Sequence, residues 1–329
     1  MIRKAVIPAA GFGTRFLPAT KSQPKEMLPI VDTPVIQYVV EEAAAAGITD
    51  ILMIIGKGKR AIEEHFDRSF QLEAQLEAAG KTAELETIRR ISELADIHFV
   101  WQKQMRGLGD AIYCARHHVK DEPFAVLLGD TVIDAESPAT GCLSEAFDAC
   151  GGSVVLLEEV DRGRVSRYGI ADAQPADKGL LRIRDFVEKP EPDKAPSNLA
   201  IASRYVFTPE IFEYLSRVQP GKNGEIQVTD AMRMMVREHP MYGLKLRGRR
   251  CDIGGKEGFV QTNVEFALKH PDMAESMRRF ILRLAEDIRK AEPAAEHGKT
   301  AEGVPSSARR RNGDSRRSED QQQFHRRSP

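Results

Sequence analysis

Short apolar segments alternate with helix-like segments through the first half of this chain, and this alternation constrains its fold more than any other feature. The apolar runs 4–10, 50–55, 97–102 and 124–129 predict strands, and 50–55 and 124–129 read as strands buried on both faces. The intervening segments that read as helices are 33–47, 57–94 and 108–118. Thr33 is the predicted N-cap of the first helix, with Pro34 at its first position and Gly47 just past its end. These segments predict an α/β fold with a Rossmann-like, mixed and mostly parallel sheet flanked by helices.

The second half of the chain is less regular. Its predicted strands are 153–160, 168–172, 181–188, 199–207 and 241–247. A turn containing Pro175 and Gly179 should pair the second of these strands with the third. The predicted helices are a short one from Pro209, then 227–238, 256–269 and 272–290.

The end of the chain divides into an amphipathic helix and a polar tail. Apolar residues recur at helical spacing within 272–290, and they are expected to pack against the body or a second subunit: Met277, Phe280, Ile281, Leu284 and Ile288. From about Pro293 the composition is too polar to bury a core, so we expect 293–329 to be disordered.

The conspicuous motifs all follow predicted strands. The loop Ala9-Ala10-Gly11-Phe12-Gly13-Thr14-Arg15 follows the first strand, 102–110 follows the third, and Gly129-Asp130 follows the fourth. In a parallel sheet the carboxyl ends of strands lie at one edge, where ligands bind. The sequence therefore predicts one convergent site.

The loop after the first strand has the composition of a phosphate-binding loop. Its small residues let a nucleotide approach the backbone, whose N–H groups can hold phosphate oxygens. Arg15 and Lys25 add positive charge where a triphosphate would lie. The loop is neither a P-loop nor a dinucleotide fingerprint, since Phe16 stands where the third glycine of the latter belongs.

Two motifs in this region together resemble a family signature. Gly11-x-Gly13-Thr14-Arg15 and Pro24-Lys25-Glu26-Met27-Leu28-Pro29 resemble sugar nucleotidyltransferases, in the version of the bacterial UTP–glucose-1-phosphate uridylyltransferases, as does 31–38. The resemblance covers roughly 2–270. It implies a fold of the nucleotide-diphospho-sugar transferase type and Mg²⁺-dependent transfer of a uridylyl group from UTP to α-D-glucose 1-phosphate, giving UDP-glucose and pyrophosphate. It also implies a catalytic domain at 1–270, a C-terminal helix at 271–292 and the tail at 293–329.

The resemblance assigns roles to individual residues. Those implied to be catalytic are Arg15, Lys25, Asp130 and Lys189. Those implied to bind the nucleotide are Ala9, Ala10, Gly11, Gly13, Thr14, Glu26, Gln102 and Gly107. Gly169, Glu188 and Lys189 would hold the sugar phosphate, and Asp130 and Asp252 would bind Mg²⁺. The chain departs from the family pattern at Asp110, where histidine is frequent, and at Thr131, which replaces a second aspartate.

Each of these residues also has a plainer interpretation. Asp130 and Asp252 could cap a helix or turn, and Glu188 with Lys189 could be a surface ion pair. No serine–histidine–aspartate or cysteine–histidine set is present, and the proposed chemistry needs none. The attacking phosphate oxygen is already ionised, so the protein has only to align two polyanions and offset their repulsion.

Composition excludes several classes of function. A formal net charge of −1 over 329 residues argues against general affinity for nucleic acid or membranes. Met1–Lys4 lead into a strand without a signal-type apolar region, so we expect a cytoplasmic protein. We also expect a homo-oligomer, a dimer or tetramer. The cysteines lack metal or redox spacing and are expected to be free thiols. The histidines, among them His65, His98, His117 and His118, also lack ligand spacing and are expected to be structural.

Three other functions are compatible with parts of the sequence. Transfer from dTTP to the same sugar phosphate is the nearest, although the Pro-Lys-Glu-Met-Leu-Pro motif and the helical insert after Gly56 favour UTP. A catalytically silent, regulatory paralogue is disfavoured because the charged site residues are retained. An RNA- or anion-binding role of the arginine-containing tail is disfavoured, since acids interrupt the arginines and aromatic residues are not interleaved.

Overall fold

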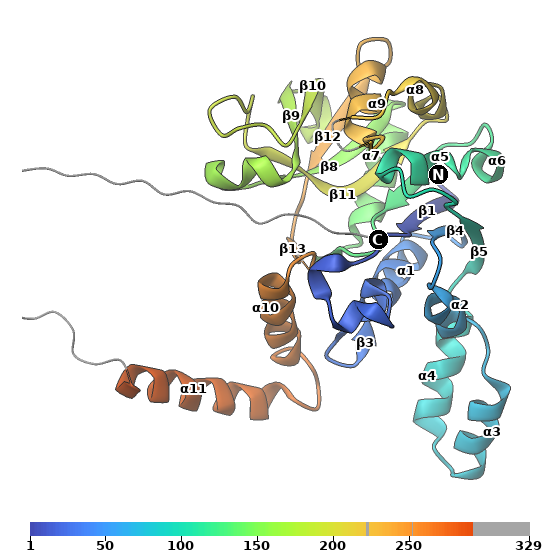
Figure 1. Cartoon of the computed structure of the whole chain (residues 1–329), viewed down its shortest axis with the longest axis vertical. Coiled ribbons are helices and arrows are strands. Elements are labelled where there is room, and N and C mark those ends of the chain that lie inside the picture. The colour runs from blue at the N-terminus through green and yellow to red at the C-terminus, as the bar shows by residue number, and fades with distance from the viewer. Residues whose placement is uncertain (222–223, 252, 292–329) are drawn as a thin grey trace, which may run out of the picture. The chain divides into compact units, whose positions relative to one another are not determined.

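The computed structural model describes residues 1–221, 224–251 and 253–291. The strands of its main sheet are β1 (Lys4–Ala9), β4 (Asp50–Ile55), β5 (Asp96–Trp101), β6 (Phe124–Leu127), β8 (Ser153–Glu159), β9 (Gly169–Pro175), β10 (Leu181–Glu188), β11 (Leu199–Phe207) and β12 (Met241–Lys245). Within the described residues these nine strands lie in the order β5-β4-β1-β6-β11-β8-β12-β10-β9 (Figure 1). The predicted mixed sheet is confirmed.

The sheet has a parallel and a largely antiparallel half. β5, β4, β1 and β6 are parallel to one another. β11 runs antiparallel to both β6 and β8, and β10 runs antiparallel to both β12 and β9, whereas β12 is parallel to β8. Parallel pairing therefore joins the elements of the first half of the chain, as the alternation of apolar and helical segments predicts.

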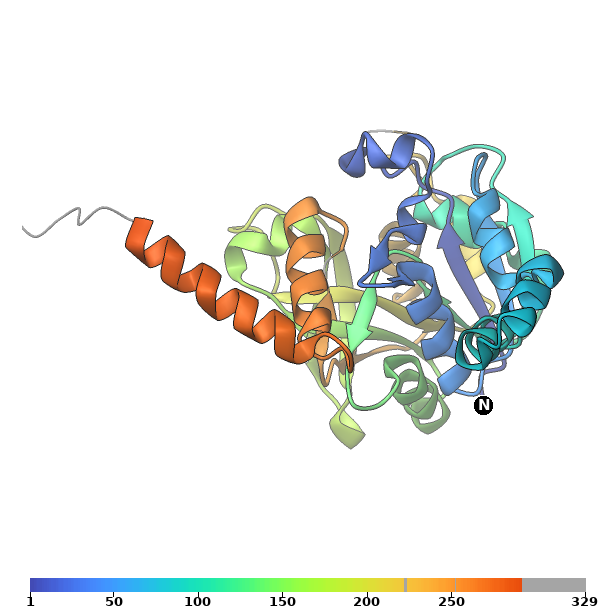
Figure 2. The same cartoon turned by 90° about the horizontal axis from the view of Figure 1, so that it is seen from below.

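Helices cover both faces of the sheet. The helices of the described residues are α1 (Val35–Ala45), α2 (Arg60–Phe66), α3 (Phe70–Ala78), α4 (Thr82–Ser92), α5 (Leu108–Tyr113), α6 (Arg116–Val119), α7 (Ala139–Cys150), α8 (Ile211–Arg217), α9 (Val228–Met235), α10 (Lys256–Ala267) and α11 (Ala274–Ala291). Successive β4 side chains point to opposite faces. Leu52 packs in a core with α5, α8 and α9, whereas Ile51 and Met53 pack in a second core with α1, α2 and α7 (Figures 1 and 2).

Two short ladders lie outside the main sheet. β7 (Val132–Asp134) pairs antiparallel with β13 (Arg249–Cys251), so that Val132 lies opposite Cys251. β2 (Pro29–Ile30) pairs with β3 (Thr33–Pro34). The first ladder brings the chain beyond residue 248 next to the loop that follows β6.

The structure corrects several predicted helices. Thr33 is not the N-cap of α1: Pro34 occupies that position without a side-chain cap, and the Thr33 hydroxyl donates to Asp32 Oδ1 (3.0 Å) instead of to the helix. The segment 57–94 forms three helices instead of one, with breaks at 67–69 and at Gly80, which has a φ of +70°. The segment 108–118 is likewise divided into α5 and α6. Neither α7 nor the β7–β13 ladder was predicted.

The chain divides into two compact units, 1–278 and 279–329. The described part of the second unit is the helical stretch to Ala291, where Phe280, Leu282, Leu284 and Ile288 have exposed side chains. Packing of this apolar face against the body or a second subunit stays a prediction, as do the boundaries at 270 and 292. The predicted tail at 293–329 lies outside the described residues.

Within the described part of the chain, no helix combines the length and the apolar character that crossing a bilayer would require.

Candidate active site

Two adjoining cavities lie at the carboxyl ends of the sheet strands. The first, of about 430 Å³, is lined by the glycine loop together with Lys25, Glu26, Gln102 and Asp130. The second, of about 320 Å³, is lined by Gly169, Glu188 and Lys189 among others. The residues that line both cavities are Gly107, Leu108, Leu128 and Glu225. The fold therefore brings together motifs from both halves of the chain.

Two of the described predicted residues, Ala9 and Arg15, do not line these cavities. Ala9 is buried in the core beneath the loop, with 1% of its surface exposed. Arg15 has an exposed side chain, and its Nη1 donates to the carbonyl of Gly254 (3.2 Å). Asp252 lies outside the described residues.

A larger cavity of about 890 Å³ lies elsewhere in the molecule. It is lined by α7, by the end of β12 and by the segment 134–137, and its lining includes none of the predicted site residues. The two smaller cavities are the better candidates, because charged and glycine residues from several strand ends converge there.

The glycines of the loop let Lys25 approach the backbone closely. Gly13 has a φ of +65°, and a Cβ there would lie 2.9 Å from Lys25 Cβ, so any larger residue would be strained and would clash. A Cβ on Gly11 would stand 3.7 Å from Lys25 Nζ. The Gly13 carbonyl also accepts a hydrogen bond from Thr20 Oγ1 (2.8 Å), which fixes the turn.

Lys25 and Asp130 form an ion pair at the floor of the first cavity. Burial opposes the charge on Lys25, but Asp130 and Glu26 outweigh it and raise the lysine pKa above its ordinary value. Burial also opposes the charge on Asp130, yet Lys25 holds the pKa of this carboxyl below its ordinary value. Both side chains remain partly exposed, at 22% and 30%, so an incoming ligand can reach them in their charged forms.

Glu26 has a different environment from its neighbour Lys25. Its carboxylate is almost fully buried and accepts a hydrogen bond from Lys59 Nζ (2.6 Å), which is buried as well. Burial raises the pKa of Glu26 and lowers that of Lys59, and each partner opposes the shift of the other. The pair ties the loop before β2 to the loop after β4. Sequence reasoning missed Lys59, although the run Gly56-Lys57-Gly58-Lys59 directly follows a buried strand.

The side-chain amide of Gln102 is held in one orientation. Its Nε2 donates to Asp110 Oδ2 (2.8 Å) and to the carbonyl of Gly107 (3.1 Å). Both acceptors lack a proton to donate, so both amide hydrogens are engaged and Oε1 is left as an acceptor. No residue in the described ranges donates to Oε1. Arg106 in turn holds Asp110 through Nη2 (2.7 Å). Asp110, at which the chain departs from the family pattern, thus orients Gln102, the residue predicted to read the base.

The second cavity places a carboxylate and a lysine side by side. Glu188 accepts hydrogen bonds from Thr229 Oγ1 (2.8 Å) and contacts Lys189 Nζ (2.8 Å). A Cβ on Gly169 would lie 3.2 Å from Glu188 Oε2 and 2.9 Å from Ile201 Cδ1, so a larger residue would require these side chains to shift. Lys189 has a φ of +45°, an uncommon conformation for lysine that turns the chain at the end of β10.

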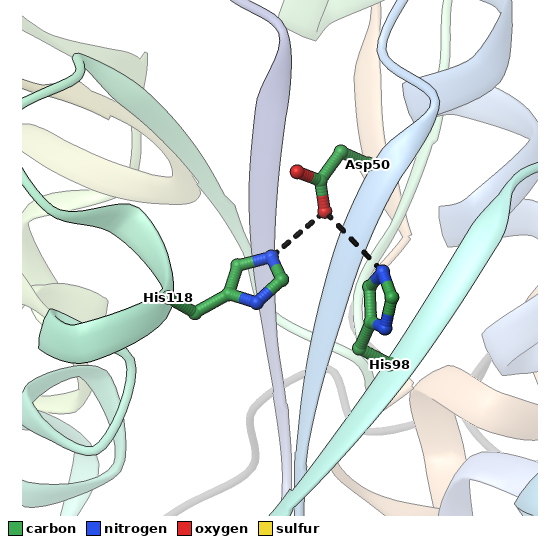
Figure 3. Close-up of side chains that lie close together, drawn as sticks. All are labelled: Asp50, His98 and His118. Carbon is green, nitrogen blue, oxygen red and sulfur yellow. Dashed lines mark hydrogen bonds and ion pairs between the residues drawn. The ribbon is translucent and has the colours of Figure 1, made fainter.

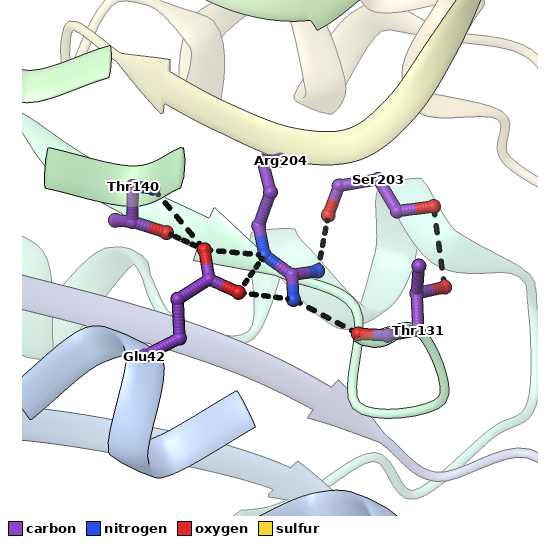
Figure 4. A network of polar contacts seen from close by, with 5 residues as sticks. All are labelled: Glu42, Thr131, Thr140, Ser203 and Arg204. Atoms are coloured by element: carbon purple, nitrogen blue, oxygen red, sulfur yellow. Dashed lines mark hydrogen bonds and ion pairs between the residues drawn. The ribbon is translucent and has the colours of Figure 1, made fainter. Parts of the chain in front are cut away.

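A buried ion pair supports the loop that carries Asp130. Arg204 has no exposed surface, and its Nη2 donates to Glu42 (2.7 Å) and to the carbonyl of Thr131 (2.8 Å) (Figure 4). Its Nη1 donates to the carbonyl of Ser203, which has a φ of +62° at an irregularity in β11. Thr140 Oγ1 also donates a hydrogen bond to the Glu42 carboxylate (2.6 Å). Glu42 and Arg204 were not identified from the sequence because they are 162 positions apart.

The described residues that flank position 252 contact loops of the candidate site. Cys251 pairs with Val132, two residues beyond Asp130, and Gly254 accepts the hydrogen bond from Arg15. The described residues on either side of position 252 are therefore close to the Asp130 loop. The partly exposed carboxylate of Asp130 is the hard oxygen donor that Mg²⁺ prefers.

Comparison with known proteins gives a consistent result. Residues 4–268 match the family model described as nucleotidyl transferase. A "UTP–glucose-1-phosphate uridylyltransferase 2" of Staphylococcus saprophyticus is 52% identical over 283 residues, which are 86% of this chain and 98% of that relative.

Two solved structures are also similar over most of the chain. A UDP-glucose pyrophosphorylase complexed with UDP-glucose is 42% identical with a TM-score of 0.76, covering 82% of this chain and all of that one. A UTP-bound UGPase from Acinetobacter baumannii is 36% identical with a TM-score of 0.80, covering 86% of this chain and all of that one. The similarity includes both halves of the sheet.

Proposed function

This chain belongs to the nucleotidyl transferase family, among the UTP–glucose-1-phosphate uridylyltransferases, and from that premise we propose the reaction that it catalyses. The chain transfers the uridylyl group of UTP to α-D-glucose 1-phosphate, and the products are UDP-glucose and pyrophosphate. The reaction is Mg²⁺-dependent, with Asp130 and Asp252 as the carboxylates that hold the ion.

The pair of adjoining cavities is the observation that carries this proposal. The first combines a glycine loop and Lys25 with the oriented amide of Gln102, which suits a nucleoside triphosphate. The second combines Glu188 with Lys189, which suits sugar hydroxyls and a phosphate. Gly107 and Leu128 line both cavities, so the two ligands would lie next to each other, as transfer between them requires.

The free acceptor of Gln102 supports a uracil base. Uracil carries a hydrogen-bond donor at N3, whereas cytosine has an acceptor at the same position. Because Asp110 and Gly107 engage both hydrogens of the Gln102 amide, Oε1 faces a bound base as an acceptor. Cytosine would bring two acceptors together, which disfavours CTP.

The charged side chains would align the reactants and offset their repulsion. Lys25 would exchange its contact with Asp130 for one with the triphosphate, and Arg15 would add charge at the loop. Lys189 would hold the acceptor phosphate so that its oxygen attacks the α-phosphorus and pyrophosphate leaves. Bound Mg²⁺ would neutralise charge on the phosphate oxygens. No protein nucleophile takes part.

Pyrophosphate release tests the proposed function directly. Purified full-length chain is given UTP, dTTP, CTP, ATP or GTP, each with glucose 1-phosphate and Mg²⁺. We expect turnover with UTP to exceed that with every other nucleotide and to disappear without Mg²⁺. Preference for dTTP would make the chain a thymidylyltransferase, and no release with any nucleotide would favour a silent paralogue. Either result contradicts the proposal.

Lys189 is predicted to anchor the acceptor phosphate. Lys189→Ala should raise the KM for glucose 1-phosphate at least about tenfold, because a charge-assisted contact is lost, and should change the KM for UTP much less. Lys178→Ala, at an exposed position outside both cavities, is the control. Unchanged kinetics toward the sugar phosphate would remove Lys189 from the site.

A further inference from the structure

Two histidines and an aspartate meet at the opposite edge of the sheet from the candidate active site. Asp50 is the first residue of β4, His98 lies on β5 and His118 on α6. Their ligand atoms all lie within 4.8 Å of one another, and among the described residues this is the group of histidine and carboxylate side chains that could share a metal ion. The spacing of the histidines in the sequence gave no sign of this convergence.

The strand register explains why these side chains converge. Leu52 of β4 lies opposite His98 of β5, and Asp50 shares the face of Leu52 because side chains alternate along a strand. α6 packs on that face through Val119, which joins the same core as Leu52 and so brings His118 over Asp50. The cluster is thus built by three elements of the fold.

The distances within the cluster lie on either side of the separation that two ligands of one cation require. Asp50 Oδ1 lies 2.7 Å from His118 Nε2 and 3.8 Å from His98 Nε2, and Figure 3 shows both rings turning this nitrogen toward the same oxygen. The first distance is a hydrogen bond, whereas the second is too long for one. Ligand atoms of a tetrahedral zinc site are roughly 3.3 Å apart, a separation that the two distances bracket.

The exposure and charge of the cluster also permit metal binding. The side chains are 25% to 54% exposed, so a cation can enter from solvent. Asp96 lies opposite Asp50 with an exposed side chain and adds negative charge. Lys4 of β1 lies opposite Asp50, but its Nζ contacts Glu122 (2.5 Å) and the carbonyl of His118 (3.2 Å) instead of the Asp50 carboxylate.

We propose that Asp50, His98 and His118 form a binding site for one divalent cation of the zinc class, separate from the nucleotide site. Two imidazole nitrogens and one carboxylate oxygen are a typical zinc ligand set, whereas Mg²⁺ and Ca²⁺ prefer oxygen alone. Water completes the coordination. β4 separates this site from the glycine loop by roughly 16 Å, so the bound ion does not touch the phosphates.

Metal binding would link the elements at this edge of the sheet. β5 is the outermost strand of the parallel half, and its side chains are mostly half-exposed or exposed. A metal ion held by β4, β5 and α6 would join this strand to the element that covers it. Its effect is therefore on stability, and it does not depend on the reaction proposed above.

Zinc titration of the untagged, full-length chain tests the proposal. The chain is treated with EDTA, dialysed and kept free of nucleotide, and calorimetry and thermal unfolding are measured with ZnCl₂. We expect one equivalent to bind and to raise Tm by about 3 °C or more at saturation. The double variant His98→Gln/His118→Gln should bind zinc at least about tenfold more weakly and lose the Tm rise. His117→Gln, an exposed neighbour on α6, is the matched control.

Cobalt distinguishes this site from the cysteines. Co²⁺ bound to nitrogen and oxygen gives visible d–d bands without thiolate charge-transfer bands, and the double variant should lose those bands. Circular dichroism and the metal-free Tm establish that each variant is folded. The proposal would be overturned if zinc did not bind, if thiolate bands appeared with Co²⁺, or if the double variant and His117→Gln bound zinc equally well.

Discussion

Side chains of the first cavity are held in their orientation or in their charged form by neighbouring residues. Asp110 engages the amide of Gln102, and Arg106 holds Asp110 by an ion pair. Lys25 and Asp130 keep each other charged, since each shifts the pKa of the other toward its ionised form. The pair therefore stays ionised through the neutral pH range. On ligand binding, Lys25 would contact phosphate and Asp130 would contact the metal in place of each other.

Asp110 is predicted to determine the choice between pyrimidines. Asp110→Asn can either donate to Gln102 or accept from it, so the amide is free to present either polar atom. We expect the ratio of kcat/KM for UTP over CTP to fall about tenfold, with the KM for glucose 1-phosphate nearly unchanged. Asp172→Asn, which removes a comparable ion pair with Arg184, is the control. An unchanged ratio would show that Asp110 does not orient Gln102.

Asp130 is predicted to be essential for turnover but not for folding. Asp130→Asn should lower kcat at least about a hundredfold, because a neutral amide is a poor ligand for Mg²⁺. Asp134→Asn, four residues along the same loop and strand, should retain activity. If Asp130 and Asp252 hold one ion, the double variant Asp130→Asn/Asp252→Asn should be no slower than the worse single variant. Additive losses would show that the two carboxylates act separately.

At the scale of elements, continuous apolar runs were the most predictable features. The strands 50–55 and 199–207 were predicted with their observed bounds, because both are buried and begin or end in apolar runs, although the second also contains Ser203 and Arg204. The β7–β13 ladder was missed, since three-residue strands paired over more than 110 positions leave no local pattern. The same applies to the Glu42–Arg204 pair, whereas the glycine loop and the Glu188-Lys189 motif lie in contiguous, readable segments.

The Glu42–Arg204 pair is predicted to stabilise the fold strongly. Arg204→Met leaves Glu42 buried without its partner and should lower the free energy of unfolding at pH 7 by about 3–5 kcal/mol. Removal of both charges in Glu42→Met/Arg204→Met should restore most of this loss. Lys245→Met, which breaks the exposed pair with Glu159, should cost less than about 1 kcal/mol.

The effect of Arg204→Met should depend on pH. Arg204 holds the pKa of Glu42 below its ordinary value of 4.5 against the effect of burial, so wild-type stabilisation is present above that value and lost as pH falls. In the variant, burial raises the pKa, and protonation at low pH relieves the penalty. The stability difference, measured by urea unfolding, should therefore narrow from pH 7 to below pH 4.5. A constant difference would exclude a role for the charge of Glu42.

At the scale of the whole molecule, the two halves of the sheet supply different parts of the site. The parallel half carries the glycine loop, Gln102 and Asp130, and the antiparallel half carries Gly169, Glu188 and Lys189. The β6–β11 pairing joins the halves, and Arg204 of β11 reaches the Asp130 loop across that junction. All described candidate residues precede α10.

The end of the chain is predicted to serve stability or assembly instead of catalysis. Truncation after Glu292 should leave kcat unchanged, because the proposed site lies entirely in earlier residues. Truncation before Pro271 removes α11 with its exposed apolar side chains and should lower Tm or the mass of the assembly in light scattering. A loss of kcat in the shorter cut, with unchanged Tm and mass, would show that the tail reaches the site.

The division of the site between the two halves of the sheet bears on how such a protein can diverge. Substitutions around Gly169 and Glu188 alter the cavity proposed for the sugar phosphate without touching the loop and amide proposed to read the nucleotide. Changes at the shared wall, formed by Gly107, Leu108, Leu128 and Glu225, would alter both cavities at once. The preference for the sugar phosphate can thus change during evolution while the preference for the nucleotide stays the same, provided that this shared wall is conserved.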